Sequence, residues 1–138
     1  MLEKAIAIAA VAHAEQTGKG GEPFILHPLR MMLRCGTDVE RVTAVLHDVV
    51  EHTEWTLEQL RGKGFPAEVI DTVDALTRRP EEPYDDYVRR AAAQPLGRLI
   101  KILDLEDNIQ RTRSVARTPD ELTKVDRYIQ ALEMLRSS

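Results

Sequence analysis

Two histidines and two aspartates stand near apolar helical segments of this 138-residue sequence and could together bind a cation: His27, His47, Asp48 and Asp104. Imidazole nitrogens and carboxylate oxygens form a mixed ligand set that suits a divalent ion of intermediate hardness such as Mn²⁺, with positions left for water or substrate. A bound cation would also compensate the charge of Asp48, which lies among apolar neighbours in "AVLHDVVEHT". Spacing alone leaves open the alternative that each is an ordinary hydrogen-bonded or exposed helix residue.

The apolar residues recur with a helical period almost everywhere, and β-rich clusters bounded by turns are missing. An all-α fold is therefore predicted. The first helix is expected to carry an apolar stripe that reaches His13 and Gln16. It should give way to a loop at "GKGGEPF", where three glycines and Pro23 make regular structure costly.

The elements that would position the four candidate ligands can be predicted from their flanking residues. A short helix containing "HPLRMMLRC" begins near His27 and is stopped by Gly36. In "TDVE", Thr37 and Glu40 form a predicted capping box for the next helix. That helix is expected to carry the adjacent histidine and aspartate at positions 47 and 48.

The second half of the chain follows the same pattern. Another capping box begins at Thr56, and Pro66 suits the first position of a helix. The segment "TRRPEEPYDD" contains two prolines and is predicted to be a loop. Pro95 is expected to start the helix "LGRLIKILDLEDNIQR", and Thr118 to cap the last helix.

Length and composition limit the possible classes. With 43% hydrophobic residues, the chain is expected to form one domain comprising residues 1–138. A net charge of −4 without a long block of like charge does not favour a nucleic acid as partner. No apolar run has membrane-spanning length and no signal peptide is recognisable, so a cytoplasmic protein without a membrane partner is expected. The single cysteine, Cys35, is interpreted as a core residue. The sequence does not fix the oligomeric state.

Three blocks carry a family resemblance. In order, "AHAEQTGKGGEPFILHP", "LHDVVEHT" and "IKILDLEDN" resemble blocks of the HD-domain hydrolases of the RelA/SpoT type, especially the small alarmone hydrolases. The resemblance implies a compact multi-helix HD-domain bundle that binds one Mn²⁺ through the four candidate ligands. It further implies a phosphohydrolase that acts on a small-molecule nucleotide, with removal of the 3′-pyrophosphate from guanosine tetra- or pentaphosphate as the leading reaction.

The resemblance also implies roles for four other residues. A metal would polarise the 3′-phosphate and lower the pKa of a bound water, and Glu51 matches a glutamate that helps to orient or deprotonate that water. His52 stands where family members commonly have aspartate, and it can still exchange protons near neutral pH. Lys19 is a candidate phosphate contact and Asn108 a candidate nucleotide contact. For Glu51, His52 and Lys19, an ordinary exposed residue remains the alternative.

Two departures weaken the implied recognition of the base. Gly18 stands where the family pattern has an arginine that stacks on guanine, and Leu105 replaces another arginine. Alternative functions therefore stay open. The chain could hydrolyse another nucleotide such as NADPH, or it could be a catalytically weak HD-type sensor that binds a nucleotide, a reading that the Glu51-His52 pair permits.

Three further residues have two interpretations each. Asp107 either orients a metal ligand or forms a surface ion pair. Tyr84 and Tyr87 either border a nucleotide pocket or pack against the helices.

Overall fold

The computed structural model describes residues 1–138 and confirms the all-α fold. No β-strand is present, and the only β-type contact is an isolated bridge between Thr17 and Pro23. The helices in chain order are α1 (Leu2–Ala12), the 3₁₀ helix η1 (Lys19–Gly21), α2 (Leu26–Leu33), α3 (Asp38–Leu46), α4 (Val49–His52), α5 (Leu57–Gly62), α6 (Ala67–Ala75), α7 (Tyr84–Ala91), α8 (Pro95–Val115) and α9 (Pro119–Arg136).

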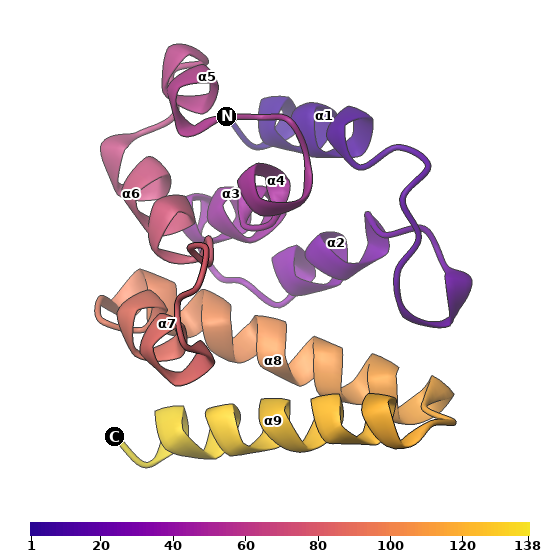
Figure 1. The fold of residues 1–138 in the computed structure, drawn as a ribbon. Coiled ribbons are helices and arrows are strands. Elements are labelled where there is room, and N and C mark those ends of the chain that lie inside the picture. The colour runs from indigo at the N-terminus through magenta and orange to yellow at the C-terminus, as the bar shows by residue number, and fades with distance from the viewer.

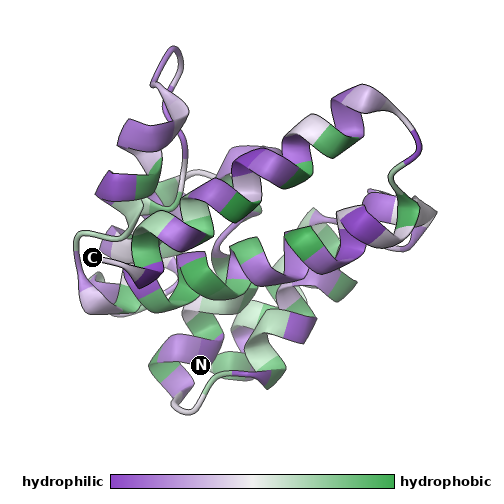
Figure 2. Cartoon of the chain, turned by 90° about the horizontal axis from the view of Figure 1, so that it is seen from below, coloured by the Kyte–Doolittle hydropathy of each residue, from purple (hydrophilic) through white to green (hydrophobic).

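Helix α8 is the central element of the bundle. It contacts α2, α3 and α6 as well as α9, which runs antiparallel beside it (Figure 1). Hydrophobic and hydrophilic residues alternate around the long helices, as expected for helices that are each partly buried (Figure 2). Because several elements pack on α8, polar residues on this helix can meet residues from α2 and from the end of α3. None of the helices combines the length and the apolar composition of a membrane span.

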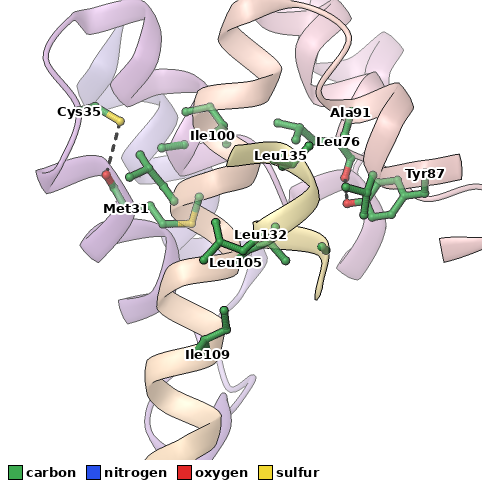
Figure 3. Packing of buried hydrophobic residues seen from close by; sticks show 14 residues of the cluster. Met31, Cys35, Leu76, Tyr87, Ala91, Ile100, Leu105, Ile109, Leu132 and Leu135 are labelled. Carbon is green, nitrogen blue, oxygen red and sulfur yellow. Dashed lines mark hydrogen bonds between the residues drawn. The ribbon is translucent and has the colours of Figure 1, made fainter. Parts of the chain in front are cut away.

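Two hydrophobic clusters support this arrangement. The first contains Ile100 and Leu105 of α8 with Leu132 and Leu135 of α9 (Figure 3). The second joins α1, α3, α5 and α6 through buried residues that include Ala5, Ala9, Val42, Val45, Leu60 and Val73. Helix α2 lies between the clusters, since Met32 packs against both.

Cys35 is buried, as predicted. Its thiol donates a hydrogen bond to the carbonyl oxygen of Met31 at 3.4 Å (Figure 3). Burial raises the pKa of the Cys35 thiol, so the group stays protonated at neutral pH.

The predicted helix starts are largely confirmed. Thr37 and Thr56 each form a complete capping box with the residue three positions later. Thr118 accepts a hydrogen bond from the amide of Glu121 at 3.2 Å, although the carboxylate of Glu121 accepts from the amide of Arg117 instead of completing the box. Pro95 is the first residue of α8. The sequence therefore sets where these helices begin.

Helix α1 is shorter than the predicted stripe. It ends at Ala12, and His13 is the cap residue. Glu15 adopts the left-handed conformation, with φ of 68°, which turns the chain away from the helix axis. Nδ1 of His13 lies 2.8 Å from Oε1 of Gln16, so the two residues still meet, but in a turn.

The segment predicted as a loop around Pro80 contains the start of a helix. Pro83 is the cap of α7, and Tyr84 is its first residue. Tyr87, Val88 and Ala91 are buried with the three- and four-residue spacing of a helical face, which the two prolines obscured in the sequence. Pro66 is likewise the cap of α6 and not its first helical residue.

Candidate metal centre and its pocket

The pair His47-Asp48 lies at a break between two helices. The prediction of one continuous helix was wrong, because α3 ends at Leu46 and α4 begins at Val49. Nδ1 of His47 donates a hydrogen bond to the carbonyl oxygen of Ala44 at 2.7 Å. This bond fixes the orientation of the ring, so that Nε2 is the ring nitrogen that remains available as a ligand atom. Asp48 occupies the cap position of α4, so the two side chains can turn toward a common point.

His27 is held by a carboxylate from α8. Its Nδ1 donates to Oδ2 of Asp107 at 2.6 Å, and Arg30 donates to both oxygens of the same carboxylate at 2.8 and 2.9 Å. Nε2 of His27 then lies 2.9 Å from Oδ1 of Asp104 and 3.8 Å from Oδ2 of Asp48. Of the two interpretations of Asp107, the geometry favours the orienting one, because a carboxylate on Nδ1 leaves Nε2 as the ligand atom.

Asp104 is held in place by a buried cation that was not predicted from the sequence. Nζ of Lys101 donates to Oδ2 of Asp104 at 2.9 Å and to the hydroxyl of Tyr87 at 3.1 Å. Lys101 is only 4% exposed. Nδ2 of Asn108 donates to Oδ1 of Asp104 at 3.1 Å. The spacing could have indicated these contacts, because Lys101 lies three residues before Asp104 and Asn108 four residues after it on the same helix.

The four predicted ligands meet. One ligand atom from each of His27, His47, Asp48 and Asp104 lies within 4.8 Å of all the others. Nε2 of His47 is 3.1 Å from Oδ2 of Asp48 and 3.4 Å from Oδ1 of Asp104. An ion with bonds of about 2.1 Å separates neighbouring ligands by about 3 Å, which is close to these distances.

An unsatisfied atom gives independent support for a cation. Nε2 of His47 is buried and makes no hydrogen bond in the protein. Buried polar atoms without partners are rare in folded proteins, and a metal ion is one way to satisfy such a nitrogen. Both the donor set and its spacing therefore fit a divalent ion, and this group could bind one.

The charged groups of the cluster keep one another ionised. Burial would raise the pKa of Asp104, but the charge of Lys101 and the hydrogen bond with His27 hold it well below its ordinary value. Burial also opposes ionisation of Asp48, yet the neighbouring His47 lowers the pKa of Asp48 to about 2. The carboxylates are thus ionised at neutral pH and ready to bind a cation.

The two imidazoles compensate these carboxylates when no metal is bound. Burial would lower the pKa of His47, but the neighbouring carboxylates of Asp48 and Asp104 together outweigh burial and raise this pKa well above its ordinary value. The pKa of His27 is raised as well, because hydrogen bonds with Asp104 and Asp107 outweigh the effect of burial. A cation entering the cluster would replace the protons on these rings.

The two predicted catalytic residues lie on α4 beside the cluster. Oε1 of Glu51 accepts a hydrogen bond from the backbone amide of Arg78 at 2.7 Å. Its Oε2 lies 3.3 Å from Nε2 of His52, which in turn lies 3.8 Å from Oδ1 of Asp48. One oxygen of Glu51 is therefore hydrogen-bonded to the backbone, while the other lies near His52.

A pocket of about 290 Å³ opens in front of the cluster. His27, Asp48 and Asp104 contribute to its lining, whereas His47 lies behind them. The structure also brings the predicted catalytic and substrate-binding residues to this pocket, namely Glu51, His52, Lys19 and Asn108.

Of the two positions that depart from the family pattern, one lines the pocket and the other is buried in the core. Gly18 lines the pocket and presents no side chain to it. Leu105 is fully buried in the first hydrophobic cluster, and it is not among the residues that line the pocket (Figure 3).

The chain is similar to proteins of guanosine tetraphosphate metabolism. It is 31% identical over 121 residues to "Guanosine-3′,5′-bis(diphosphate) 3′-pyrophosphohydrolase" of Aquifex aeolicus, a match that covers 79% of this chain and 17% of the relative. It is 29% identical over 139 residues to "Bifunctional (p)ppGpp synthase/hydrolase SpoT" of Escherichia coli, covering 91% of this chain and 20% of that protein. No protein-family model matches the chain. These relatives confirm the resemblance predicted from the three sequence blocks.

A solved structure supports the fold. It is described as a metazoan ortholog of SpoT that hydrolyses ppGpp, and it matches with a TM-score of 0.82 and 21% sequence identity over 98% of this chain and 85% of that chain. The chain spans about a fifth or less of the length of the curated relatives named above, so those proteins contain much that this chain does not match.

Proposed function

From the similarity to HD-domain hydrolases of the RelA/SpoT type, we propose that residues 1–138 fold as one domain, a metal-dependent phosphohydrolase acting on a phosphorylated nucleotide. The observation that carries the proposal is the convergence of four ligand atoms at the floor of a pocket that cationic side chains also line. Mn²⁺ is the proposed ion, held by His27, His47, Asp48 and Asp104, because two nitrogens and two carboxylates suit an ion of intermediate hardness. When bound, such an ion supplies Lewis acidity and a water of lowered pKa.

The residues of α4 would handle the proton of the attacking water. Glu51 is held by the amide of Arg78, so its second oxygen has a defined position from which to orient or accept a proton from that water. His52 lies within 3.3 Å of this oxygen and about half of its side chain is exposed, which allows it to pass the proton on to solvent. The pair thus provides a base and an exchange partner on one short helix.

The substrate would be held by residues outside the cluster. Lys19 lines the pocket without a hydrogen-bond partner in the protein, and it is proposed to contact a phosphate group. Asn108 uses its amide nitrogen on Asp104, which leaves its carbonyl oxygen for the nucleotide. We propose guanosine tetra- or pentaphosphate as the substrate and loss of the 3′-pyrophosphate as the reaction.

One observation favours a second candidate substrate. Gly18 lines the pocket where the family pattern has the arginine that stacks on guanine, so selection for this base is weakened. Hydrolysis of another phosphorylated nucleotide, such as NADPH, is therefore the alternative. A nucleotide sensor with little turnover would use the same pocket and the same metal.

A nucleotide panel tests the proposal. Purified protein is treated with a chelator, reloaded with Mn²⁺, and incubated with guanosine tetraphosphate, guanosine pentaphosphate or NADPH. We expect release of pyrophosphate from the two guanosine nucleotides. Release of phosphate from NADPH alone would favour the alternative substrate, and metal-dependent nucleotide binding without any release would identify a sensor.

A further inference from the structure

The loop between α6 and α7, residues 76–83, carries the backbone amide that binds Glu51 (Figure 1). That amide belongs to Arg78, and it donates to Oε1 of Glu51 at 2.7 Å. Loops are generally more mobile than the helices that they connect, so a loop amide holds a carboxylate in place only when other groups hold the loop. The orientation of Glu51 therefore depends on what fixes this part of the backbone.

The other end of the same peptide group is bound by an arginine of α7. Nη2 of Arg90 donates to the carbonyl oxygen of Thr77 at 3.0 Å. The carbonyl of Thr77 and the amide of Arg78 belong to one planar trans peptide group, in which C=O and N–H point in opposite directions. A hydrogen bond that fixes the carbonyl therefore fixes the direction of the amide. It also polarises the peptide group, which strengthens the amide as a donor.

Arg90 is itself held in one orientation. Its Nε and Nη2 donate to the two carboxylate oxygens of Glu82 at 2.9 and 2.8 Å, a geometry that suits the planar guanidinium. The hydrogen bond from Arg90 lowers the pKa of Glu82 to about 2, so the pair is charged at neutral pH. Nη1 of Arg90 donates to the carbonyl oxygens of Asp74 and Ala75 at 3.4 and 3.3 Å. Arg90 thus joins α7 both to the end of α6 and to the loop.

Three consecutive residues of the loop are bound to the Arg90–Glu82 pair. Besides the carbonyl of Thr77, the amide of Arg79 donates to Oε1 of Glu82 at 3.2 Å. The guanidinium of Arg78 donates to the carbonyl oxygen of Glu82 at 3.0 and 3.2 Å. Neither Arg90 nor Glu82 lines the pocket, so the pair can influence the chemistry only through the loop.

We propose that Arg90 is a positioning residue that orients the carboxylate of Glu51 through the peptide group between Thr77 and Arg78. The proposal rests on the proposed function, because it assumes that Glu51 handles the proton of the attacking water. Without Arg90 the peptide group can rotate, and its amide no longer holds Oε1 of Glu51. The second oxygen of Glu51 then loses the defined position that proton transfer requires.

A double-mutant cycle tests this link. The values of kcat and KM for guanosine tetraphosphate are measured with Mn²⁺ for wild type, Arg90→Gln, Glu51→Gln and the double variant. We expect Arg90→Gln to lower kcat by about 10- to 100-fold and to leave KM within about twofold of wild type, since displacement of the base slows the reaction and not binding. In the Glu51→Gln background, the same substitution should change kcat by less than about twofold, because no base remains to be positioned.

Two outcomes of the cycle would overturn the proposal. Equal losses of kcat from Arg90→Gln in the two backgrounds would mean that Arg90 only supports the fold at the end of α6. An unchanged kcat in Arg90→Gln would mean that the base is oriented without it. If Arg90→Gln does not fold, Arg90→Lys takes its place in the cycle with the same criteria, because lysine keeps the charge beside Glu82 but lacks the planar guanidinium. The control is Arg89→Gln, which should keep wild-type kcat and KM, since Arg89 is exposed, pairs with Asp86 and does not line the pocket.

An NMR experiment separates this proposal from the proposed function. The hydrogen-exchange rate of the Arg78 backbone amide is measured in metal-free protein, so no turnover is needed. We expect Arg90→Gln to raise this rate by at least about tenfold, as when a hydrogen bond to a charged group is lost, and Arg89→Gln to leave it unchanged. If no nucleotide is hydrolysed but the exchange rate shows this dependence, the link from Arg90 to Glu51 stands and the hydrolase proposal fails. If Arg90→Gln exchanges like wild type, the link is wrong whatever the enzyme hydrolyses.

Discussion

The two walls of the pocket differ in how their polar groups are satisfied. On the wall formed by α2, α8 and the α3–α4 break, Asp107, Lys101 and the carbonyl of Ala44 each hold a candidate metal ligand. On the wall formed by α7 and α9, the hydroxyl of Tyr84 and the guanidinium of Arg127 have no partner. We infer that folding itself organises the first wall, whereas it leaves these two groups of the second wall unpaired.

This difference predicts how substitutions should behave. A buried, paired network affects stability and chemistry together, because removal of one member leaves another buried and unpaired. A group without a partner contributes little to folding, so removing it should change stability little.

Glu51→Gln should have the largest effect on activity. The amide keeps an oxygen that can accept from the backbone amide of Arg78, but it cannot take a proton from water. We expect a loss of kcat of about 100- to 10,000-fold, as for a removed general base. Metal content and melting temperature should stay at wild-type values; a Glu51→Gln enzyme with normal kcat would remove this residue from the mechanism.

Asp104→Ala should have the largest effect on folding. It leaves the ammonium group of Lys101 buried without its carboxylate, which costs about 3–5 kcal/mol in other proteins. Chemical denaturation measures this loss. Asp120→Ala, at an exposed position in the first turn of α9, is the control and should lower the free energy of unfolding far less. Equal losses of stability in the two variants would show that the first wall is not a paired network.

Asp107→Asn should weaken metal binding without abolishing it. Asparagine can still accept from Nδ1 of His27, but it loses the charge that binds Arg30. We expect an affinity for Mn²⁺ lower by about 10- to 100-fold, the usual effect of removing a group that orients a ligand. Calorimetric titration measures this affinity. An affinity equal to that of wild type would mean that Asp107 only forms an ion pair and does not orient His27.

Metal affinity should rise with pH. Since the pKa values of His27 and His47 are raised in the metal-free protein, binding must displace protons from these rings. The apparent affinity for Mn²⁺ should increase by up to about tenfold per pH unit per displaced proton until the rings are neutral. Titration in buffers of different ionisation enthalpy measures proton release directly. At a pH where the rings are still protonated in the metal-free protein, binding without proton release would mean that the imidazoles are not ligands.

Tyr84→Phe should have the smallest effect on stability. The hydroxyl that it removes makes no hydrogen bond, so the free energy of unfolding should change by less than about 0.5 kcal/mol or rise slightly. Tyr87→Phe is the matched control, because the hydroxyl of Tyr87 donates to the carbonyl of Leu76 at 2.8 Å and accepts from Lys101. A greater loss for Tyr84→Phe than for Tyr87→Phe would contradict the comparison of the two walls.

Much of the fold could be predicted from local patterns. The boxes at Thr37 and Thr56 and the proline at position 95 fix helix starts, because each satisfies or removes free backbone amides locally. Helix α7 was missed because Pro83 seemed to extend a loop, whereas it caps a helix. The break at His47 was also missed, since it depends on a side chain bonding the carbonyl of Ala44.

The candidate site was only partly predictable. Its four ligands came from residue type and from the resemblance, and the fold brings them together. The partners that hold them could not be assigned from the sequence, because Asp107 meets His27 across 80 positions and Lys101 looks like any helix lysine until α8 is buried. The unpartnered state of Tyr84 likewise depends on the packing of α7 against α8 and α9.

Direct titration of Mn²⁺ into chelator-treated wild type and Asp48→Ala tests the central claim, that the four side chains bind one divalent ion. Asp48→Ala removes a ligand without unpairing a lysine or an arginine, so the fold should survive. We predict one Mn²⁺ per chain for wild type, with a stability gain of about 2.7 kcal/mol at a free metal concentration of 100 Kd. For Asp48→Ala we expect neither binding of Mn²⁺ nor a gain in stability when Mn²⁺ is added. Equal Mn²⁺ binding by both proteins would contradict the account.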